Sequence, residues 1–254
     1  MVYKYLVLFV TGLGTDKHYY GELSRNIKTL YESKRIGEMD PSDIAIKYYY
    51  FDKSTSPDNA ANLYETVTQY QKLYDKIITC AFSISCHASL HAYSLLYQSG
   101  TLGQDNLILI DPLNINALTS TIKMVISAPS IFLFAWDRLP MFLKYYILKS
   151  TSKDTPALVD KNLAQMSAFH IRHQLKQYIY PNNQLLAFKK DIEPKVLVGV
   201  NSKYTCDYSM WNDVDFILGN HHIIYNNPEY VAQSIIKHVY TSTNWFPGQK
   251  MKIV

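Results

Sequence analysis

The sequence has few cysteines, no cluster of positive charge and no long apolar run, and each shortage excludes a class of protein. Its three cysteines cannot all pair with one another, so we expect a reducing, cytoplasmic environment and no disulfide framework. The formal net charge is only +4 and the lysines and arginines are scattered, which argues against a nucleic-acid partner. The apolar run over residues 5–10 is too short for a signal sequence or a transmembrane segment, and it is typical of a buried strand.

The composition is that of one globular domain. With 254 residues, 48% of them hydrophobic and 18% charged, the chain can bury one substantial core, and no linker or internal repeat divides it. We therefore expect residues 1–254 to form a single domain. The sequence leaves the oligomeric state open.

Strand-like and helix-like segments alternate along most of the chain. Almost continuously apolar runs, typical of strands covered on both faces, are separated by segments with helical periodicity. This alternation predicts right-handed crossovers and a doubly wound, mainly parallel α/β sheet. The strands are expected at "YLVLFV", "IAIKYYY", "KIITCAF", "LILI", "KVLVGV" and "VDFIL".

The alternation is interrupted over residues 113–192, where several helix-like stretches follow one another without a convincing strand. We expect a helical cap insertion that shares one core and one cleft with the sheet. Its aromatic and Met-rich stretch, "SIFLFAWDRLPMFLKYY", is interpreted as core or as the lining of an apolar acyl pocket.

The stretch "TCAFSISCHASL", residues 79–90, contains the candidate nucleophile. Ligands of doubly wound sheets bind beyond the carboxyl ends of the strands, and Ser83 and Ser85 come directly after a predicted strand. A nucleophile elbow is a tight, strained turn that needs small residues two positions before and after the nucleophile. Ser83 has Ala81 and Ser85 there, whereas Ser85 would have His87 at one position. Ser83 is therefore the preferred nucleophile and Ser85 the alternative; a serine-rich helix cap would also fit the pattern.

The segment "DKIITCAFSIS" resembles the strand and nucleophile elbow of the α/β-hydrolase superfamily, although neither flank of Ser83 is the usual glycine. Other segments resemble the family in the same order, so the similarity spans nearly the whole chain. They are "LVLFVTGLGTDKHYYGELSRNI", "IAIKYYYFDKSTSP", "NLILIDPL", "IEPKVLVGV" and "GNHHIIYNNPEYVAQSIIKHV". The resemblance implies an α/β-hydrolase-like fold, no cofactor, and a small-molecule ester or acyl substrate.

A serine hydroxyl needs a base within hydrogen-bond reach and a third group that orients the base. His221 is the expected base, because it follows a strand-like run and a Gly219-Asn220 turn, and the resemblance implies a proline seven residues further on, at Pro228. The neighbouring His222 is the alternative.

The resemblance implies that the acid follows the strand-like run "KVLVGV", where Asp207 is the nearest carboxylate beyond Tyr204. Asp111, at the end of "LILI", is the alternative, because some members of the family take their acid from that strand. Asp213 and Asp215 also remain open, as does the absence of an acid.

The oxyanion that forms on the substrate must be met by preorganised N–H donors. We expect these to be the backbone amides of Leu13 and Ile84. Gly12 and Gly14 permit close backbone approach, and Thr11 stands where the family commonly has a histidine.

The sequence predicts neither a metal nor a nucleotide cofactor. His87 and His91 are spaced to share a helix face, but only Cys86 lies beside them, and no further ligand completes a site. "TGLGTD" lacks the pattern of a phosphate-binding loop and of the dinucleotide fingerprint.

Two functions compete. The first is a serine hydrolase that cleaves ester or thioester bonds through an acyl-enzyme, on a small or acyl-chain apolar substrate. The alternative is an inactive protein of the same fold that binds a ligand or partner. An acyltransferase would use the same residues as the hydrolase, so the sequence does not separate them.

Overall fold

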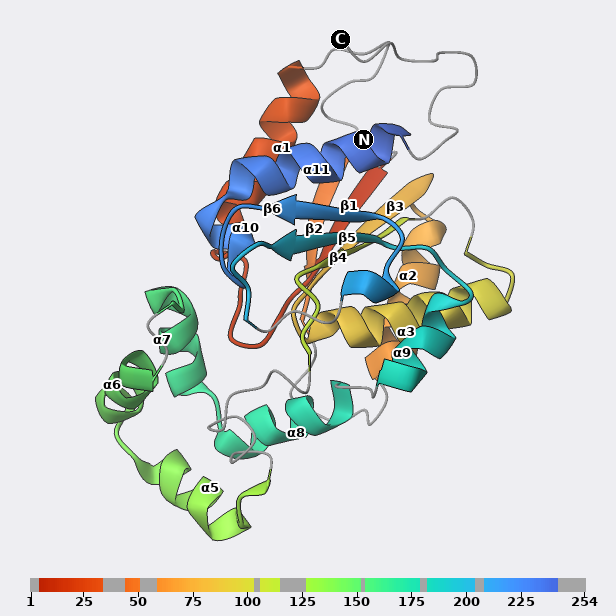
Figure 1. Cartoon of the computed structure of the whole chain (residues 1–254). Coiled ribbons are helices and arrows are strands. Elements are labelled where there is room, and N and C mark those ends of the chain that lie inside the picture. The colour runs from red at the N-terminus through yellow and green to blue at the C-terminus, as the bar shows by residue number, and fades with distance from the viewer. Residues whose placement is uncertain are drawn as a thin grey trace, which may run out of the picture.

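The computed structural model describes residues 5–33, 44–50, 59–102, 106–114, 127–151, 154–178, 182–203 and 208–241. Within them, six strands form one sheet in the order β2-β1-β3-β4-β5-β6, and every neighbouring pair is parallel (Figure 1). The strands are β1 (Tyr5–Val10), β2 (Ile44–Tyr49), β3 (Lys76–Phe82), β4 (Asn106–Ile110), β5 (Lys195–Gly199) and β6 (Val214–Ile217). The predicted doubly wound parallel sheet is confirmed.

Helices cover both faces of the sheet. One layer contains α1 (Gly21–Ser33), α10 (Ile223–Asn226) and α11 (Pro228–Thr241). The other contains α2 (Asn59–Gln71), α3 (Ser85–Gln98) and α9 (Asn182–Lys189). The chain runs outward from β1 to β2 and then returns to β3 on the other side of β1. The strand order thus reverses between β1 and β3, and a ligand crevice is expected beyond the carboxyl ends of these two strands.

The segment between β4 and β5 contains a series of helices in the part that the structure describes. It forms α5 (Ser130–Arg138), α6 (Met141–Thr151), α7 (Ala157–Gln165), α8 (Ala168–Tyr178) and then α9. Figure 1 shows α5, α6 and α7 at the lower end of the molecule, away from α1 and α11. Because α7 packs on Gly14 through Leu163 and Val159, the insertion reaches the loop that follows β1.

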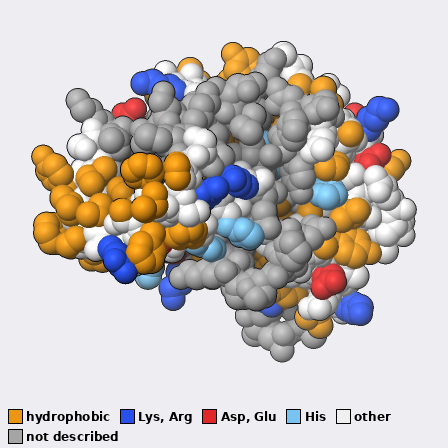
Figure 2. Space-filling model, turned by 90° about the horizontal axis from the view of Figure 1, so that it is seen from below, with side chains coloured by type: hydrophobic (Ala, Val, Ile, Leu, Met, Phe, Trp, Pro, Cys, Tyr) orange, Lys and Arg blue, Asp and Glu red, His pale blue; other side chains and the backbone are white. Residues whose placement is uncertain are grey.

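The stretch "SIFLFAWDRLPMFLKYY" was interpreted as core, and this is wrong for most of its large side chains. Leu133 is buried, but six of the others are between 50% and 73% exposed. Figure 2 shows hydrophobic side chains gathered over one end of the molecule. A short aromatic run predicts packing but does not say whether a partner within the chain is available.

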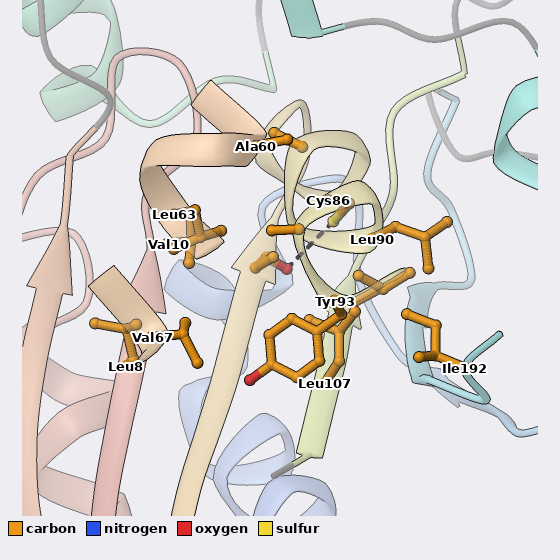
Figure 3. Packing of buried hydrophobic residues seen from close by; sticks show 14 of the residues in the cluster. Leu8, Val10, Ala60, Leu63, Val67, Cys86, Leu90, Tyr93, Leu107 and Ile192 are labelled. Atoms are coloured by element: carbon orange, nitrogen blue, oxygen red, sulfur yellow. Dashed lines mark hydrogen bonds between the residues drawn. The ribbon is translucent and has the colours of Figure 1, made fainter. Parts of the chain in front are cut away.

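The core has two halves, one on each face of the sheet. Along β1, Leu6, Leu8 and Val10 point to the α2–α3 side, and Val7 and Phe9 point to the α1–α11 side. Figure 3 shows the first half, where side chains of β1, α2, α3 and β4 interlock. This two-sided burial explains why the strands are apolar throughout.

The two described cysteines are free thiols inside the core. Burial raises the pKa of the Cys80 thiol well above its usual range, and the Cys86 thiol donates to the Ala81 carbonyl at 3.2 Å (Figure 3). Both act as small hydrophobic residues, while Cys206 lies outside the described residues. No helix in the described ranges is long and apolar enough to cross a bilayer.

Candidate active site

The turn between β3 and α3 holds Ser83 in a left-handed backbone conformation, with φ of 59°. This conformation costs a residue other than glycine roughly 1–2 kcal/mol, so neighbouring interactions must hold it. The Ser83 amide donates to the Ile110 carbonyl of β4 at 2.9 Å, and the Ser83 carbonyl accepts from the Cys86 amide at 3.2 Å. The turn is therefore pinned to the adjacent strand and to the first turn of α3.

Ser85 lies inside this turn and does not face the cleft. Its hydroxyl is fully buried and accepts a hydrogen bond from the Phe82 amide at 2.9 Å. Its single proton is shared between the Val10 carbonyl at 2.9 Å and the Phe82 carbonyl at 2.8 Å. Ser85 thus fills the position where the family usually has glycine, and it fastens the turn to β1.

Ser83 and His221 meet although they are 138 positions apart. The Ser83 hydroxyl lies 2.8 Å from His221 Nε2, and His221 Nδ1 lies 3.2 Å from the Asp111 carboxylate. A carboxylate only accepts hydrogen bonds, so it selects the tautomer in which Nδ1 donates to Asp111 and Nε2 accepts from Ser83. The three side chains form one buried chain of hydrogen bonds from the Asp111 carboxylate to the Ser83 hydroxyl, which we term the relay.

Asp111 is the carboxylate that the structure places beside His221. It directly follows β4, is fully buried, and adopts φ of 47°. Its amide donates to the Leu197 carbonyl of β5 at 2.7 Å, which fixes it between two strands. Asp207 lies outside the described residues.

Asp213 and Asp215, also left open by the sequence, flank the Lys195 ammonium instead, at 2.5 and 2.8 Å. Burial lowers the pKa of this lysine, but the two carboxylates outweigh burial and raise the pKa overall. These acids fasten β5 to β6 and stand apart from the relay.

His222 turns away from Ser83 and pairs with Tyr19. The Tyr19 hydroxyl and His222 Nδ1 are hydrogen-bonded at 2.9 Å, and the Tyr19 ring stacks on Phe82 of β3. Burial, with a smaller effect of the charge on His221, lowers the pKa of His222 to about 3. Burial likewise raises the pKa of Tyr19 well above its usual value, so both groups stay neutral beside the relay. No local pattern links Tyr19 to a residue 203 positions later.

The loop after β1 is shaped by three contacts. Thr11 donates to the Tyr49 carbonyl through its amide at 3.0 Å and its hydroxyl at 3.2 Å, so the threonine ties the loop to β2. The Gly12 amide donates to the Tyr20 hydroxyl at 3.3 Å. From α7, the Asn162 side chain donates to the Gly14 carbonyl at 3.0 Å. The sequence contained no signal for this role of Asn162.

The amides of Leu13 and Ile84 have no acceptor among the residues that the structure describes. Leu13 follows the carboxyl end of β1 and Ile84 follows that of β3, and the strand order reverses between these two strands. Such unpaired donors are what an oxyanion site requires.

A pocket of about 260 Å³ opens at this loop. Ile84, Gly12 and Gly14 line it on the side of the sheet. The insertion contributes mostly polar side chains, namely Asn162, Gln165, Met166, His170 and Gln174. The cleft beside Ile84 therefore combines polar and apolar surface.

No protein-family model matches the sequence, and no curated protein matches it significantly. Similar solved structures, in contrast, cover nearly the whole chain. A hydrolase from Pseudomonas aeruginosa PA01 has a TM-score of 0.62 at 11% identity, over 93% of this chain and 90% of that chain. The chain has the α/β-hydrolase fold.

Two further structures with this fold are similar to the chain. An enol-lactonase from Burkholderia xenovorans LB400 has a TM-score of 0.59 at 9% identity, over 94% of this chain and 92% of that one. A thioesterase domain from the curacin biosynthetic pathway has a TM-score of 0.56 at 13% identity, over 92% of this chain and 91% of that one.

The histidine pair on α3 has other partners in this α/β-hydrolase fold. His87 Nε2 donates to the Leu113 carbonyl at 2.7 Å, and His91 stacks on Phe188 of α9. Burial lowers the pKa of His87 to about 4, so it stays neutral. Within the described ranges, no three His, Cys, Asp or Glu side chains are placed to hold a metal ion.

The two serines should differ in what they stabilise. Ser85→Ala leaves the buried Phe82 amide and Val10 carbonyl without their partner, which should lower the free energy of unfolding by about 1–3 kcal/mol. Ser83→Ala should lower it less, because the Ser83 hydroxyl contacts one described partner, His221 Nε2, and holds no strand backbone. Urea unfolding of both variants measures this, and equal losses would contradict the assignment of Ser85 to the turn.

Gly199 should prove intolerant of a side chain. A Cβ there would lie 2.4 Å from the Asn220 carbonyl oxygen, so Gly199→Ala must displace the backbone just before His221. Any reaction that uses His221 should slow at least about tenfold. Gly21→Ala is the matched control, because nothing lies within 4 Å of a Cβ at that position. Unchanged turnover in Gly199→Ala would show that the loop accommodates the methyl group.

Stability should fall as the solution is acidified below neutral pH. His87 and His222 have pKa values of about 4 and about 3 in the folded chain, below the ordinary value of 6.5. Between pH 6.5 and these lower pKa values, the unfolded chain binds more protons than the folded chain. Each histidine therefore lowers the free energy of unfolding by up to about 1.4 kcal/mol for each unit by which the pH falls. Chemical unfolding at pH 7 and pH 5 measures the slope. His87→Gln and His222→Gln should each reduce it, and an unreduced slope would argue against these residues.

Proposed function

We propose that the protein is a serine hydrolase that cleaves ester or thioester bonds through an acyl-enzyme. The observation that supports this most directly is the relay Asp111–His221–Ser83, with its 3.2 and 2.8 Å contacts. In this proposal Ser83 is the nucleophile, His221 the base and Asp111 the acid that orients the base. Asp111 takes the role that the sequence first suggested for Asp207.

The reaction follows from this geometry in two halves. Ser83 Oγ attacks the substrate carbonyl carbon while its proton passes to His221 Nε2, and the negative oxygen of the tetrahedral intermediate is met by the Leu13 and Ile84 amides. The imidazolium then gives its proton to the departing alcohol or thiol, which leaves an ester on Ser83. Water attacks this ester with His221 as base, and the acid product departs.

Burial makes the relay effective. Asp111 is fully buried and His221 is only 8% exposed, so the carboxylate acts on the imidazolium through little intervening water. The imidazolium that forms during attack gains most from the Asp111 carboxylate, which accepts the hydrogen bond of Nδ1. Stabilisation of a charge that appears only during the reaction lowers the barrier.

The insertion over residues 113–192 serves, in this proposal, as a cap on the active site. Asn162 and the apolar side chains of α7 hold the loop that carries Leu13. The substrate is a small-molecule ester or acyl compound, and the polar side chains that line part of the pocket at Ile84 can hydrogen-bond to it. The names of two similar structures, an enol-lactonase and a thioesterase domain, agree with this substrate class. A cytoplasmic location remains a prediction.

Replacement of the relay residues should separate their roles. Ser83→Ala and His221→Ala should each lower kcat for a short p-nitrophenyl ester by about 10⁴-fold or more, and the double variant should lose no more than either one, because the two act as a unit. Asp111→Asn should cost about 10²–10⁴-fold, since it removes the charge and the preferred tautomer of His221. Asp207→Asn is the matched control and should stay within about twofold.

A fluorophosphonate probe with peptide mapping tests the same assignment without a substrate. Wild-type protein should be labelled at Ser83, and His221→Ala should suppress labelling. Folded protein that shows neither labelling nor ester turnover would support the inactive, ligand-binding alternative. Transfer of the acyl group to an added alcohol or amine in preference to water would identify an acyltransferase.

A further inference from the structure

Two consecutive helices of the insertion, α5 and α6, expose an unusual amount of apolar surface. Six large side chains, each at least 50% exposed, define what we term the α5–α6 patch: Ile131, Phe132, Phe134, Met141, Phe142 and Tyr146. Single exposed hydrophobic residues are common, but a group on adjacent helices marks an interaction site. In Figure 2 hydrophobic side chains dominate one end of the molecule, with Lys and Arg side chains beside them.

The charges around the patch are mainly positive. In the described residues 127–151 and 154–178 there are six basic residues, Arg138, Lys144, Lys149, Lys161, Arg172 and Lys176. The same ranges hold three acidic residues, Asp137, Asp154 and Asp160, and no glutamate. Asp137 accepts bonds from the Ser167 hydroxyl and the Ala168 amide, both at 2.6 Å, and Asp160 is only 1% exposed. Lys144 is buried as well, and Lys149 lies 3.9 Å from Asp160. Arg138, Lys161 and Lys176 are exposed against Asp154, so the accessible charge in these ranges is positive on balance.

One cation is held directly against the patch. The Arg138 guanidinium lies 4.1 Å from the centre of the Phe134 ring, so its charge is kept at the edge of the apolar surface. This pairing of aromatic rings with a cation is typical of side chains that sit at the boundary between water and lipid.

An apolar pocket of about 410 Å³ lies between α6 and α7 and is continuous with the patch. Two patch residues, Met141 and Phe142, form part of its wall, together with Leu158 and Ala164. Lys161 is the charged residue in its lining. A pocket of this chemistry suits a hydrocarbon chain whose polar end carries a negative charge.

We propose that the α5–α6 patch binds the surface of an anionic lipid bilayer. The helices would lie in the interface with their apolar side chains among the lipid chains and their cations at the headgroups. A second copy of the chain fits less well, because a symmetric contact would place positive charge against positive charge. This inference concerns binding alone and does not depend on the activity proposed for Ser83.

Flotation with lipid vesicles tests the proposal. Wild-type protein should float with phosphatidylcholine vesicles that contain phosphatidylserine, and less with phosphatidylcholine alone. The double variant F132S/F142S should bind at least about tenfold more weakly. F216S/L218S is the matched control, since both residues are exposed at the far edge of the sheet near β6, and it should bind like wild type. Arg138→Gln and Lys161→Gln should each weaken binding to the anionic vesicles about fivefold.

Several outcomes would overturn the proposal. The first is that the folded wild-type protein does not bind vesicles, and the second is that F132S/F142S and F216S/L218S lose vesicle binding equally. The third is a dimer in light scattering that F132S/F142S abolishes, which would assign the patch to a second copy. Thermal unfolding verifies that F132S/F142S is folded, as expected when exposed side chains are replaced. Ser83→Ala should bind vesicles like wild type, so a failure of the proposed hydrolysis is distinguished from a failure of lipid binding.

Discussion

The left-handed turn at Ser83 is the constraint around which the site is arranged. It brings the β3 strand abruptly into α3 and leaves the Ser83 side chain at the carboxyl edge of the sheet. Hydrogen bonds to β4 and, through Ser85, to β1 offset the cost of the backbone conformation. Because parallel strands end at one edge, the residues that follow β1, β4 and β6 arrive at the same place.

Burial of Asp111 is the second constraint. A carboxylate removed from water is stable only when it is paired and hydrogen-bonded, and His221 supplies this contact. The nearby Tyr19 and His222 are kept neutral by burial, so they bring no competing charge. Asp111 and His221 therefore meet in a buried setting, where their contact is little screened by water.

The insertion contacts the loop after β1 on one side and exposes apolar side chains on the other. On its inner side, α7 contacts the loop after β1 through Asn162, Leu163 and Val159, so the insertion contributes to the shape of this loop. On its outer side, α5 and α6 leave large apolar side chains in water, which lowers solubility and is retained where a surface has a partner. One segment thus links the geometry beside Ser83 to an exposed apolar surface.

The sequence by itself determined the strands, their parallel arrangement and the position of the turn at Ser83, because these depend on short-range patterns. Continuous apolar runs predicted strands buried on both faces, and the small residues Ala81 and Ser85 distinguished Ser83 from its neighbour. Only the tertiary structure decided that Asp111 lies beside His221 and that Asn162 braces the loop. Asp111 and His221 are 110 positions apart, and Gly14 and Asn162 are 148 positions apart. Both pairings therefore depend on how strands and helices pack. Nor did hydrophobicity along the chain separate buried Leu133 from exposed Phe132, since the two differ only in whether another helix covers them.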